Sequence, residues 1–193
     1  MIVTTFAFLN LLIYNAQVFN LNFNMNSKIT IRFATLKDLP SIVTIYNQAI
    51  KSNCATGDTE EVLLDDRIKW FNKFDNNSYP LYIAEINKKV VGYCTISPYR
   101  PGRKAMSKVA EISYYVDYSF HKKGIGTALL NYAILDCKRI GKKNLVAFLL
   151  DINTSTIGLL TKFNFKQLGH LPNVIELKTR VCGHYIYGLK IKI

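Results

Sequence analysis

Apolar and polar residues alternate along several short segments of the chain, a pattern that is typical of strands with one buried face. Another segment, residues 145–150, is apolar throughout and indicates a fully buried strand. Two alternating segments are separated only by the polar residues 87–89, which predicts a hairpin. Strands are therefore predicted at 29–33, 81–86, 90–97, 109–116 and 145–150, with another beginning at 165–168 and a last one at 185–193.

Apolar residues with helical spacing lie between these strands. The first helix follows Thr35 and Asp38, whose spacing is that of a capping box. Helices are expected from Leu39 to Ile50, from a cap at Thr59 through Phe71, from Gly124 to Gly141, and at 156–162. Strands and helices in this order predict an α/β architecture, with a mixed sheet and helices on its faces.

Residues 1–27 differ from the rest of the chain because they contain no charged residue. Three asparagines interrupt their apolar run, so they match neither a signal peptide nor a membrane span of about 20 mainly apolar residues. We expect this uncharged leader not to belong to the native protein, which would begin at Met25. Residues 28–193 are expected to form a single domain.

The 193 residues include 25 lysines and arginines against 13 acidic residues, a formal net charge of +12. This excess favours anionic partners. The basic residues are scattered rather than gathered on one arm or helix, so neither a nucleic-acid nor a membrane partner is expected. The four cysteines lack metal-ligand spacing and are expected to be reduced, in a cytoplasmic protein that binds no metal. Cys94 and Cys137 are predicted core residues.

A basic loop with two glycines, Gly124 and Gly126, connects the strand 109–116 to the next helix. A helix N-terminus presents free N–H groups and a partial positive charge, and glycine lets a phosphate approach the backbone closely. Lys122 and Lys123 add positive charge. Many ordinary connections also contain two glycines, so spacing alone leaves phosphate binding and a simple tight turn both open.

Glu111 lies within the strand 109–116, on the same face as Ser113 and Tyr115. A carboxylate among so many apolar residues either reaches water at an edge or lies in a functional cavity. Partial burial would raise its pKa and make it a better proton acceptor near neutrality. The residues alone leave both interpretations open.

Taken together, these features resemble the GCN5-related N-acetyltransferase (GNAT) superfamily, and within it the phosphinothricin N-acetyltransferase-like group. The superfamily signature falls on residues 121–126. Further matches are the helix 67–70, the strand 91–93, the loop 98–103, Glu111 before Tyr115 and Val116, and Asn153 with Thr156, Leu159 and Phe165. The resemblance covers almost all of 28–193. It implies the GNAT acyl-CoA N-acyltransferase fold, a central mixed β-sheet flanked by helices, and a homodimer as is common in the group.

The resemblance further implies acetyl-CoA as co-substrate, with its pantetheine arm between two splayed parallel strands and its diphosphate on the glycine loop. His121 stands where the family has Gln or Arg, either as a cofactor contact or as a solvated loop residue. The implied cofactor-binding residues are Tyr114, Tyr115, Val116, His121, Lys122, Lys123, Gly124, Ile125, Gly126, Thr127 and Asn153.

By the same resemblance, Glu111 matches the proposed general base, which takes a proton from the substrate ammonium directly or through water. Leu160 stands where the family often has Tyr or His near the leaving sulfur, and leucine cannot donate a proton. The general acid is therefore unassigned, and three alternatives stay open. Water could help the thiolate to leave, another tyrosine could take the place of the missing one, or turnover could be slow. Arg100 and Arg103 lie in the group's substrate loop, as acceptor contacts or as solvated arginines.

We therefore expect an acetyl-CoA-dependent N-acetyltransferase that acts on the primary amine of a small amino-acid-like molecule, such as phosphinothricin or methionine sulfoximine. Two alternatives stay open. One is an acetyltransferase of protein N-termini or lysines, and the other is a catalytically weak acetyl-CoA-binding module.

Overall fold

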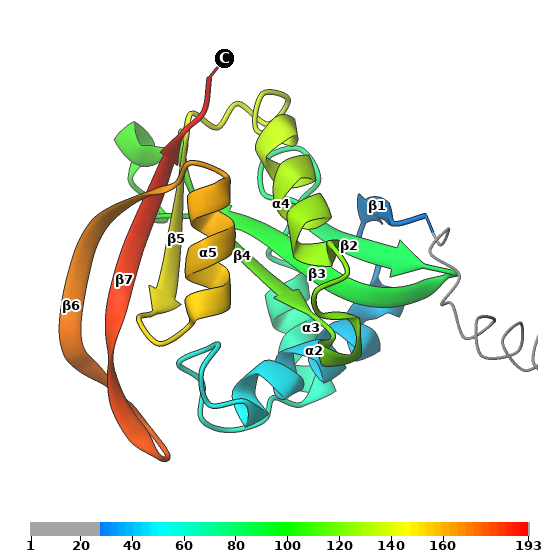
Figure 1. Cartoon of the computed structure of the whole chain (residues 1–193). Coiled ribbons are helices and arrows are strands. Elements are labelled where there is room, and N and C mark those ends of the chain that lie inside the picture. The colour runs from blue at the N-terminus through cyan, green and yellow to red at the C-terminus, as the bar shows by residue number, and fades with distance from the viewer. Residues whose placement is uncertain (1–27, 193) are drawn as a thin grey trace, which may run out of the picture.

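A seven-stranded sheet forms the centre of the molecule (Figure 1). The structure, a computed structural model, describes residues 28–192, so the predicted leader lies outside the described residues. The strand order is β1-β2-β3-β4-β5-β7-β6, and β4 and β5 are the parallel pair in an otherwise antiparallel sheet. The strands are β1 Thr30–Phe33, β2 Leu81–Ile86, β3 Lys89–Pro98, β4 Val109–Val116, β5 Asn144–Leu150, β6 Lys166–Leu177 and β7 Arg180–Lys190.

Helices cover both faces of this sheet. Along β2, Leu81 and Ile83 pack with Ile42 and Ile45 of α2, whereas Tyr82 and Ala84 pack in the cluster that contains Leu129 and Leu130 of α4. Alternate residues of a strand point to opposite faces, so α2 and α4 lie on opposite sides. The helices are α2 Leu39–Lys51, α3 Leu64–Phe71, α4 Ile125–Asp136 and α5 Thr154–Lys162, and short 3-10 turns lie at Leu36–Asp38, Lys104–Met106 and Tyr118–Phe120. The predicted mixed α/β sheet is confirmed.

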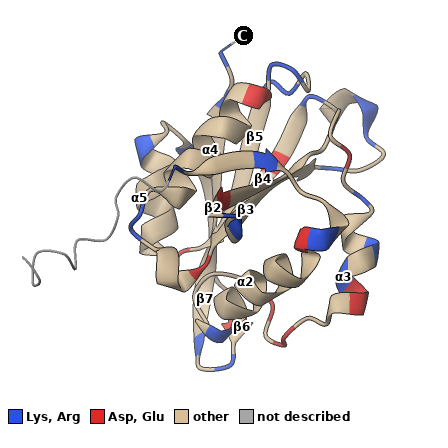
Figure 2. Ribbon diagram, turned by 90° about the vertical axis from the view of Figure 1, so that its right-hand side faces the viewer, with Lys and Arg blue, Asp and Glu red and all other residues tan. Residues whose placement is uncertain are grey.

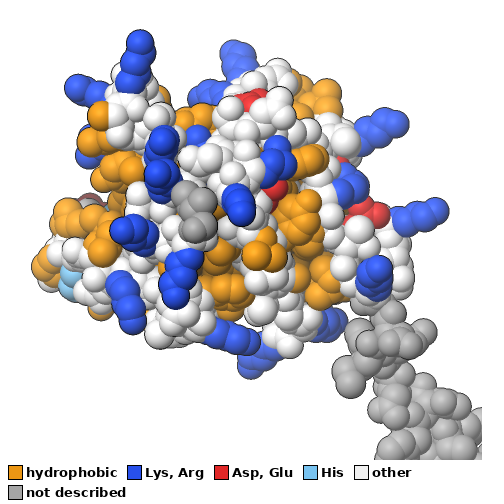
Figure 3. Space-filling model, turned by 90° about the horizontal axis from the view of Figure 1, so that it is seen from above, with side chains coloured by type: hydrophobic (Ala, Val, Ile, Leu, Met, Phe, Trp, Pro, Cys, Tyr) orange, Lys and Arg blue, Asp and Glu red, His pale blue; other side chains and the backbone are white. Residues whose placement is uncertain are grey.

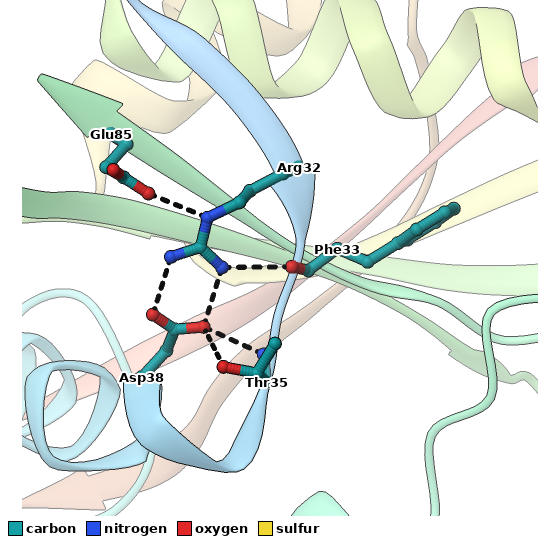
Figure 4. A network of polar contacts seen from close by, with 5 residues as sticks. All are labelled: Arg32, Phe33, Thr35, Asp38 and Glu85. Atoms are coloured by element: carbon teal, nitrogen blue, oxygen red, sulfur yellow. Dashed lines mark hydrogen bonds and ion pairs between the residues drawn. The ribbon is translucent and has the colours of Figure 1, made fainter. Parts of the chain in front are cut away.

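A polar network fixes the start of α2 on the edge of the sheet (Figure 4). Arg32 of β1 donates to Glu85 of β2 at 2.7 Å and to both carboxylate oxygens of Asp38 at 2.8 Å. Asp38 also accepts from the backbone N–H of Thr35, as the capping box predicts, and from the Thr35 hydroxyl. Burial alone would raise the pKa of Asp38, but these hydrogen bonds hold it below its ordinary value.

The helix that was expected from Thr59 begins only at Leu64, so that prediction was wrong. The preceding segment is extended because it is bonded to α2. The side-chain amide of Asn47 donates to the Val62 carbonyl at 3.1 Å and accepts from the Val62 N–H at 3.0 Å. These contacts satisfy the backbone at Val62 without a helical turn.

Several other boundaries also differ from the prediction, most of them by a single residue. The last strand begins at Arg180 rather than 185, because β6 and β7 form a hairpin whose register shifts obscure the alternation. The last helix begins at 154 rather than 156, with Asn153 as its cap. α4 ends at Asp136, and Gly141, with φ 69°, closes the turns that follow it. The hairpin at 87–89 is confirmed: both central residues, Asn87 and Lys88, have positive φ.

Charged side chains are spread over many elements rather than gathered in one stripe (Figures 2 and 3). Lysines and arginines far outnumber acidic residues on the end of the molecule seen from above (Figure 3). All four cysteines are free thiols, and Cys94 and Cys137 are fully buried as predicted. Among the described residues, no helix has both the length and the apolar character needed to cross a membrane.

Candidate active site

The two parallel strands at the centre of the sheet separate after a short pairing. β4 and β5 are in register only at Val109–Asn144, Ala110–Leu145 and Glu111–Val146. β4 then continues to Val116, and β5 continues to Leu150. A crevice of about 540 Å³ lies where the strands diverge, lined by both strands, the start of α4 and the first turn of α5.

The crevice brings together almost all the residues that were predicted to bind the cofactor. Lys123 is the exception. Its ammonium group donates to the Ser119 carbonyl at 3.0 Å and lies 4.7 Å from the centre of the Phe120 ring. The residues that line the crevice are Tyr114, Tyr115, Val116, His121, Lys122, Gly124, Ile125, Gly126, Thr127 and Asn153.

Two glycines at the start of α4 have different tasks. Gly124 is the N-cap and has φ +80°, and a Cβ added there would point into open space. A Cβ at Gly126 would lie 3.1 Å from Leu159 Cδ2 and 3.4 Å from Tyr114 Cε2, so this glycine permits close packing. The first amides of a helix have no intrahelical partner. Together with the neighbouring lysine, Lys122, they suit a diphosphate.

Asn153 closes the N-terminus of α5 with its side chain. Its Oδ1 accepts from the Thr156 N–H at 3.2 Å and from the Ser155 hydroxyl at 3.1 Å. With the oxygen engaged on the helix, the amide nitrogen is the part of the side chain that is left to donate into the crevice. The sequence predicted the contact with the crevice but not the capping.

Glu111 lies next to the crevice, in the last residue pair that joins β4 to β5. Ile112 and Ser113, the next residues, line the crevice wall, whereas Glu111 itself is half-buried just beyond it. Burial raises the pKa of Glu111, and a hydrogen bond at 3.5 Å from the Ser113 hydroxyl lowers it in part. A carboxylate in this setting accepts a proton at a pH closer to neutrality than an exposed glutamate.

An aromatic row extends from the crevice across the neighbouring strands. The ring of Phe148, which lines the crevice, stacks on Tyr99 at 6.1 Å and on His184 at 5.6 Å between centroids. Burial lowers the pKa of His184, which favours the neutral imidazole. The guanidinium of Arg100 lies 5.7 Å from the centre of the Tyr99 ring, so the structure places Arg100 beside this row. Arg103 is exposed, and its backbone N–H donates to the Arg100 carbonyl at 3.3 Å.

Sequence reasoning missed Phe148 and His184. Phe148 lies within a continuous apolar run, in which no pattern separates residues that face a site from residues that face the core. His184 is far from any cluster of acidic residues in the sequence, so nothing around it marks it as a site residue. Only the pairing of β5 with β7 brings the two rings onto one face.

Leu160 cannot donate a proton to the leaving sulfur, whereas the hydroxyl of Tyr114 can. Leu160 is fully buried in the core, and its neighbour Leu159 lines the crevice instead. Tyr114 lines the crevice, and its ring lies against Gly126 at the start of α4. Burial raises the pKa of this phenol to about 12.

Comparisons with known proteins agree with this architecture. The model of the acetyltransferase (GNAT) family matches residues 42–165. Bacillus subtilis YwnH, provisionally assigned as a phosphinothricin acetyltransferase, is 36% identical over 149 residues, which are 77% of this chain and 90% of that protein. An L-methionine sulfoximine/L-methionine sulfone acetyltransferase of Salmonella typhimurium is 31% identical over 145 residues, 75% of this chain and 84% of that protein.

A solved structure extends the likeness to the fold. The GNAT superfamily phosphinothricin acetyltransferase from Sinorhizobium meliloti, in complex with acetyl-CoA, is 26% identical with a TM-score of 0.79, over 84% of this chain and 88% of that one. Sequence and structure therefore agree: the chain belongs to the acetyltransferase (GNAT) family, and it is similar to relatives named as phosphinothricin and methionine sulfoximine acetyltransferases.

Proposed function

We propose that this enzyme transfers the acetyl group of acetyl-CoA to the primary amine of a small amino-acid-like molecule. The observation that carries the proposal is the crevice between β4 and β5, which is lined by the first turn of α4 and lies next to Glu111. The relatives support it: one acetylates methionine sulfoximine or methionine sulfone, and another binds acetyl-CoA.

The crevice suits the elongated shape of acetyl-CoA. Its diphosphate would lie on the amides of residues 124–127, beside Lys122. Beyond Glu111, the backbone groups of β4 that face β5 have no partner in that strand, so they are available to the amides of the pantetheine arm. His121 already contacts this edge, because its Nε2 lies 3.0 Å from the Val116 carbonyl oxygen. The Asn153 amide would donate to the same arm from α5.

Glu111 would act as the general base. An alkylammonium has no free electron pair, so it must lose a proton before it attacks the thioester. The raised pKa of Glu111 fits it for taking that proton, directly or through water. A backbone N–H near Tyr115 would stabilise the oxyanion, and the crevice would contribute further by holding amine and thioester together.

The acceptor would bind beside the aromatic row. Arg100 would pair with a carboxylate or phosphinate group, while the rings of Tyr99, Phe148 and His184 would pack against the aliphatic part of the substrate. This combination of one cation and a short apolar wall suits a free amino acid better than a peptide chain. The homodimer that the resemblance implies stays a prediction, which light scattering on the purified protein tests.

Release of free thiol from acetyl-CoA tests the proposal. The purified full chain is assayed with methionine sulfoximine, methionine sulfone, phosphinothricin, the common amino acids and a set of short peptides. We expect turnover with amino-acid-like amines. Turnover with peptides alone would indicate a protein acetyltransferase, and tight acetyl-CoA binding without any turnover would indicate a binding module.

A further inference from the structure

Position 160 of α5, where the family often has Tyr or His, carries a leucine and therefore has no polar group. Thr156 stands one turn earlier on the same side of the helix, because residues four apart lie above each other. A helical side chain leans toward the N-terminus of its helix and covers the preceding turn. A polar group on a longer side chain at position 160 would therefore lie beside Thr156, which lines the crevice.

The phenol of Tyr114 reaches that place from the sheet. Tyr114 packs against the core cluster on the face of β4 that carries Ala110 and Ile112, the face covered by α4 and α5. Its ring lies against the start of α4 at Gly126. The largest influence on its pKa is burial, which raises it, and the Thr156 hydroxyl lowers it in part, so the two hydroxyls are neighbours.

The other tyrosines of the crevice point elsewhere. The ring of Tyr115 meets Tyr46 edge-on at 5.0 Å and stacks on Tyr93 at 5.2 Å, on the face that carries α2 and α3. Tyr118 is exposed, with its ring 4.4 Å from that of His121. Serine and threonine hydroxyls of the crevice are much weaker acids than a phenol. Tyr114 is thus the acidic hydroxyl that faces α5.

We propose that Tyr114 of β4 is the proton donor of this enzyme. It takes over the task of the Tyr or His that the family often has on α5, at the position where this chain has Leu160. It would touch the sulfur of coenzyme A and protonate it as the acetyl group leaves. The inference rests on the proposed acetyl transfer. It explains how a leucine can stand at position 160 of an active enzyme.

The proton transfers balance with this assignment. The amine, after one proton has passed to Glu111, forms a bond from nitrogen to the carbonyl carbon of the thioester. The carbon–sulfur bond then breaks, its electron pair stays on sulfur, and the proton of the Tyr114 hydroxyl moves to sulfur. The nitrogen gives up its remaining extra proton through water to the phenolate, so Tyr114 ends neutral. Glu111 releases its proton to solvent.

Tyr114→Phe tests the assignment because it removes one oxygen and keeps the ring. With acetyl-CoA and an acceptor that the wild type uses, we expect kcat to fall on the order of 100-fold while the acetyl-CoA dissociation constant stays unchanged. The matched control is Tyr132→Phe, at an exposed tyrosine on α4. It should retain the wild-type kcat.

The selenium analogue of acetyl-CoA separates proton donation from a packing role. A selenol is a far stronger acid than a thiol, so the selenolate leaves without being protonated. We expect Tyr114→Phe to approach the wild-type rate with the selenoester, although it is slow with the thioester. A variant that only disturbs packing would be slowed equally with both.

Rescue gives a second readout. Tyr114→Phe combined with Leu160→Tyr should recover part of the lost kcat, whereas Tyr114→Phe with Leu160→Phe should not. Position 160 is in the core, so circular dichroism checks that both double variants fold, and the selenoester comparison decides if they do not. A full wild-type kcat in Tyr114→Phe, or equal losses with both esters, would overturn the inference. A wild type that acetylates no amine would instead overturn the proposed function on which it rests.

Discussion

Glu111 of β4 lies opposite Val146 of β5 in the last residue pair that holds these two parallel strands in register. The sheet itself therefore fixes the position of this carboxylate, at the point from which the crevice opens. A group held by strand pairing on both sides is better positioned than one on a loop.

The first prediction concerns Glu111 in catalysis. Glu111→Gln keeps the size of the side chain and removes its basicity, so kcat/KM should fall by roughly 10²- to 10⁴-fold with acetyl-CoA affinity retained. The wild-type rate should rise with pH as Glu111 loses its proton, and this limb of the profile should vanish in the variant. An identical pH–rate profile in both proteins would exclude Glu111 as the base.

Glu111→Gln should lower activity, but it should raise the stability of the folded protein near neutral pH. Burial raises the pKa of Glu111 above its usual value of 4.5, so the folded protein holds this proton more tightly than the unfolded chain does. Ionisation therefore costs folding free energy above the folded-state pKa and costs nothing below about 4.5. Thermal unfolding of Glu111→Gln should occur at a higher temperature than wild type near neutral pH, and the difference should disappear in acid. A variant that is less stable at every pH would contradict this.

Gly124 and Gly141 offer a matched pair for the diphosphate site. Both have positive φ, at +80° and +69°, and a Cβ at either would meet no atom of the chain. Alanine should therefore destabilise each by a similar amount, about 1 kcal/mol, from backbone strain alone. Only Gly124→Ala should also weaken acetyl-CoA binding, measured by calorimetry. Equal affinities in the two variants would place the diphosphate elsewhere.

Asn153 combines two tasks that different substitutions separate. Asn153→Asp keeps an oxygen that caps α5 and removes the amide donor, so thermal stability should be retained while acetyl-CoA affinity falls. Asn153→Ala removes both and should also lose about 1 kcal/mol of stability. If the aspartate variant binds acetyl-CoA like the wild type, the Asn153 amide is no ligand of the cofactor arm.

Arg100 should act on the acceptor alone. Arg100→Ala removes the cation beside Tyr99, so the KM for an acceptor with a carboxylate should rise roughly tenfold, as expected for a lost charge-assisted bond. The acetyl-CoA dissociation constant should not change. Lys104→Ala, at an exposed lysine in the 3-10 turn that follows this loop, is the control. Equal effects of the two would indicate only a general influence of positive charge.

Much of the fold could be predicted because its strands follow simple alternation. β4 and β2 have the predicted bounds, since their alternating residues pack against helices on two opposite faces. The start of α3 could not be predicted, because it depends on the contact of Asn47 with Val62. Local propensity contains no information about a bond between residues 15 positions apart.

The candidate site divides in the same way. Most residues of the continuous motif at 121–127 could be placed together from the sequence, because they form the loop and first turn at the start of one helix. Their binding of a diphosphate stays a prediction. The aromatic row could not, since Tyr99, Phe148 and His184 come from three segments that meet only through the order of the strands. The surroundings of the Tyr114 side chain could not be predicted either, because Gly126 and Thr156 become its neighbours only when α4 and α5 pack on the sheet.

The brief pairing of β4 with β5 has a consequence for the whole molecule. One group of strands, β1 to β4, is joined to the other, β5 to β7, through only three residue pairs of the sheet. A pantetheine arm laid along the open edge of β4 would behave as a short additional strand and fasten the two groups together. Binding of acetyl-CoA would then strengthen the connection between the two groups of strands. At a free concentration one hundred times Kd, the cofactor would add about 2.7 kcal/mol to the free energy of unfolding.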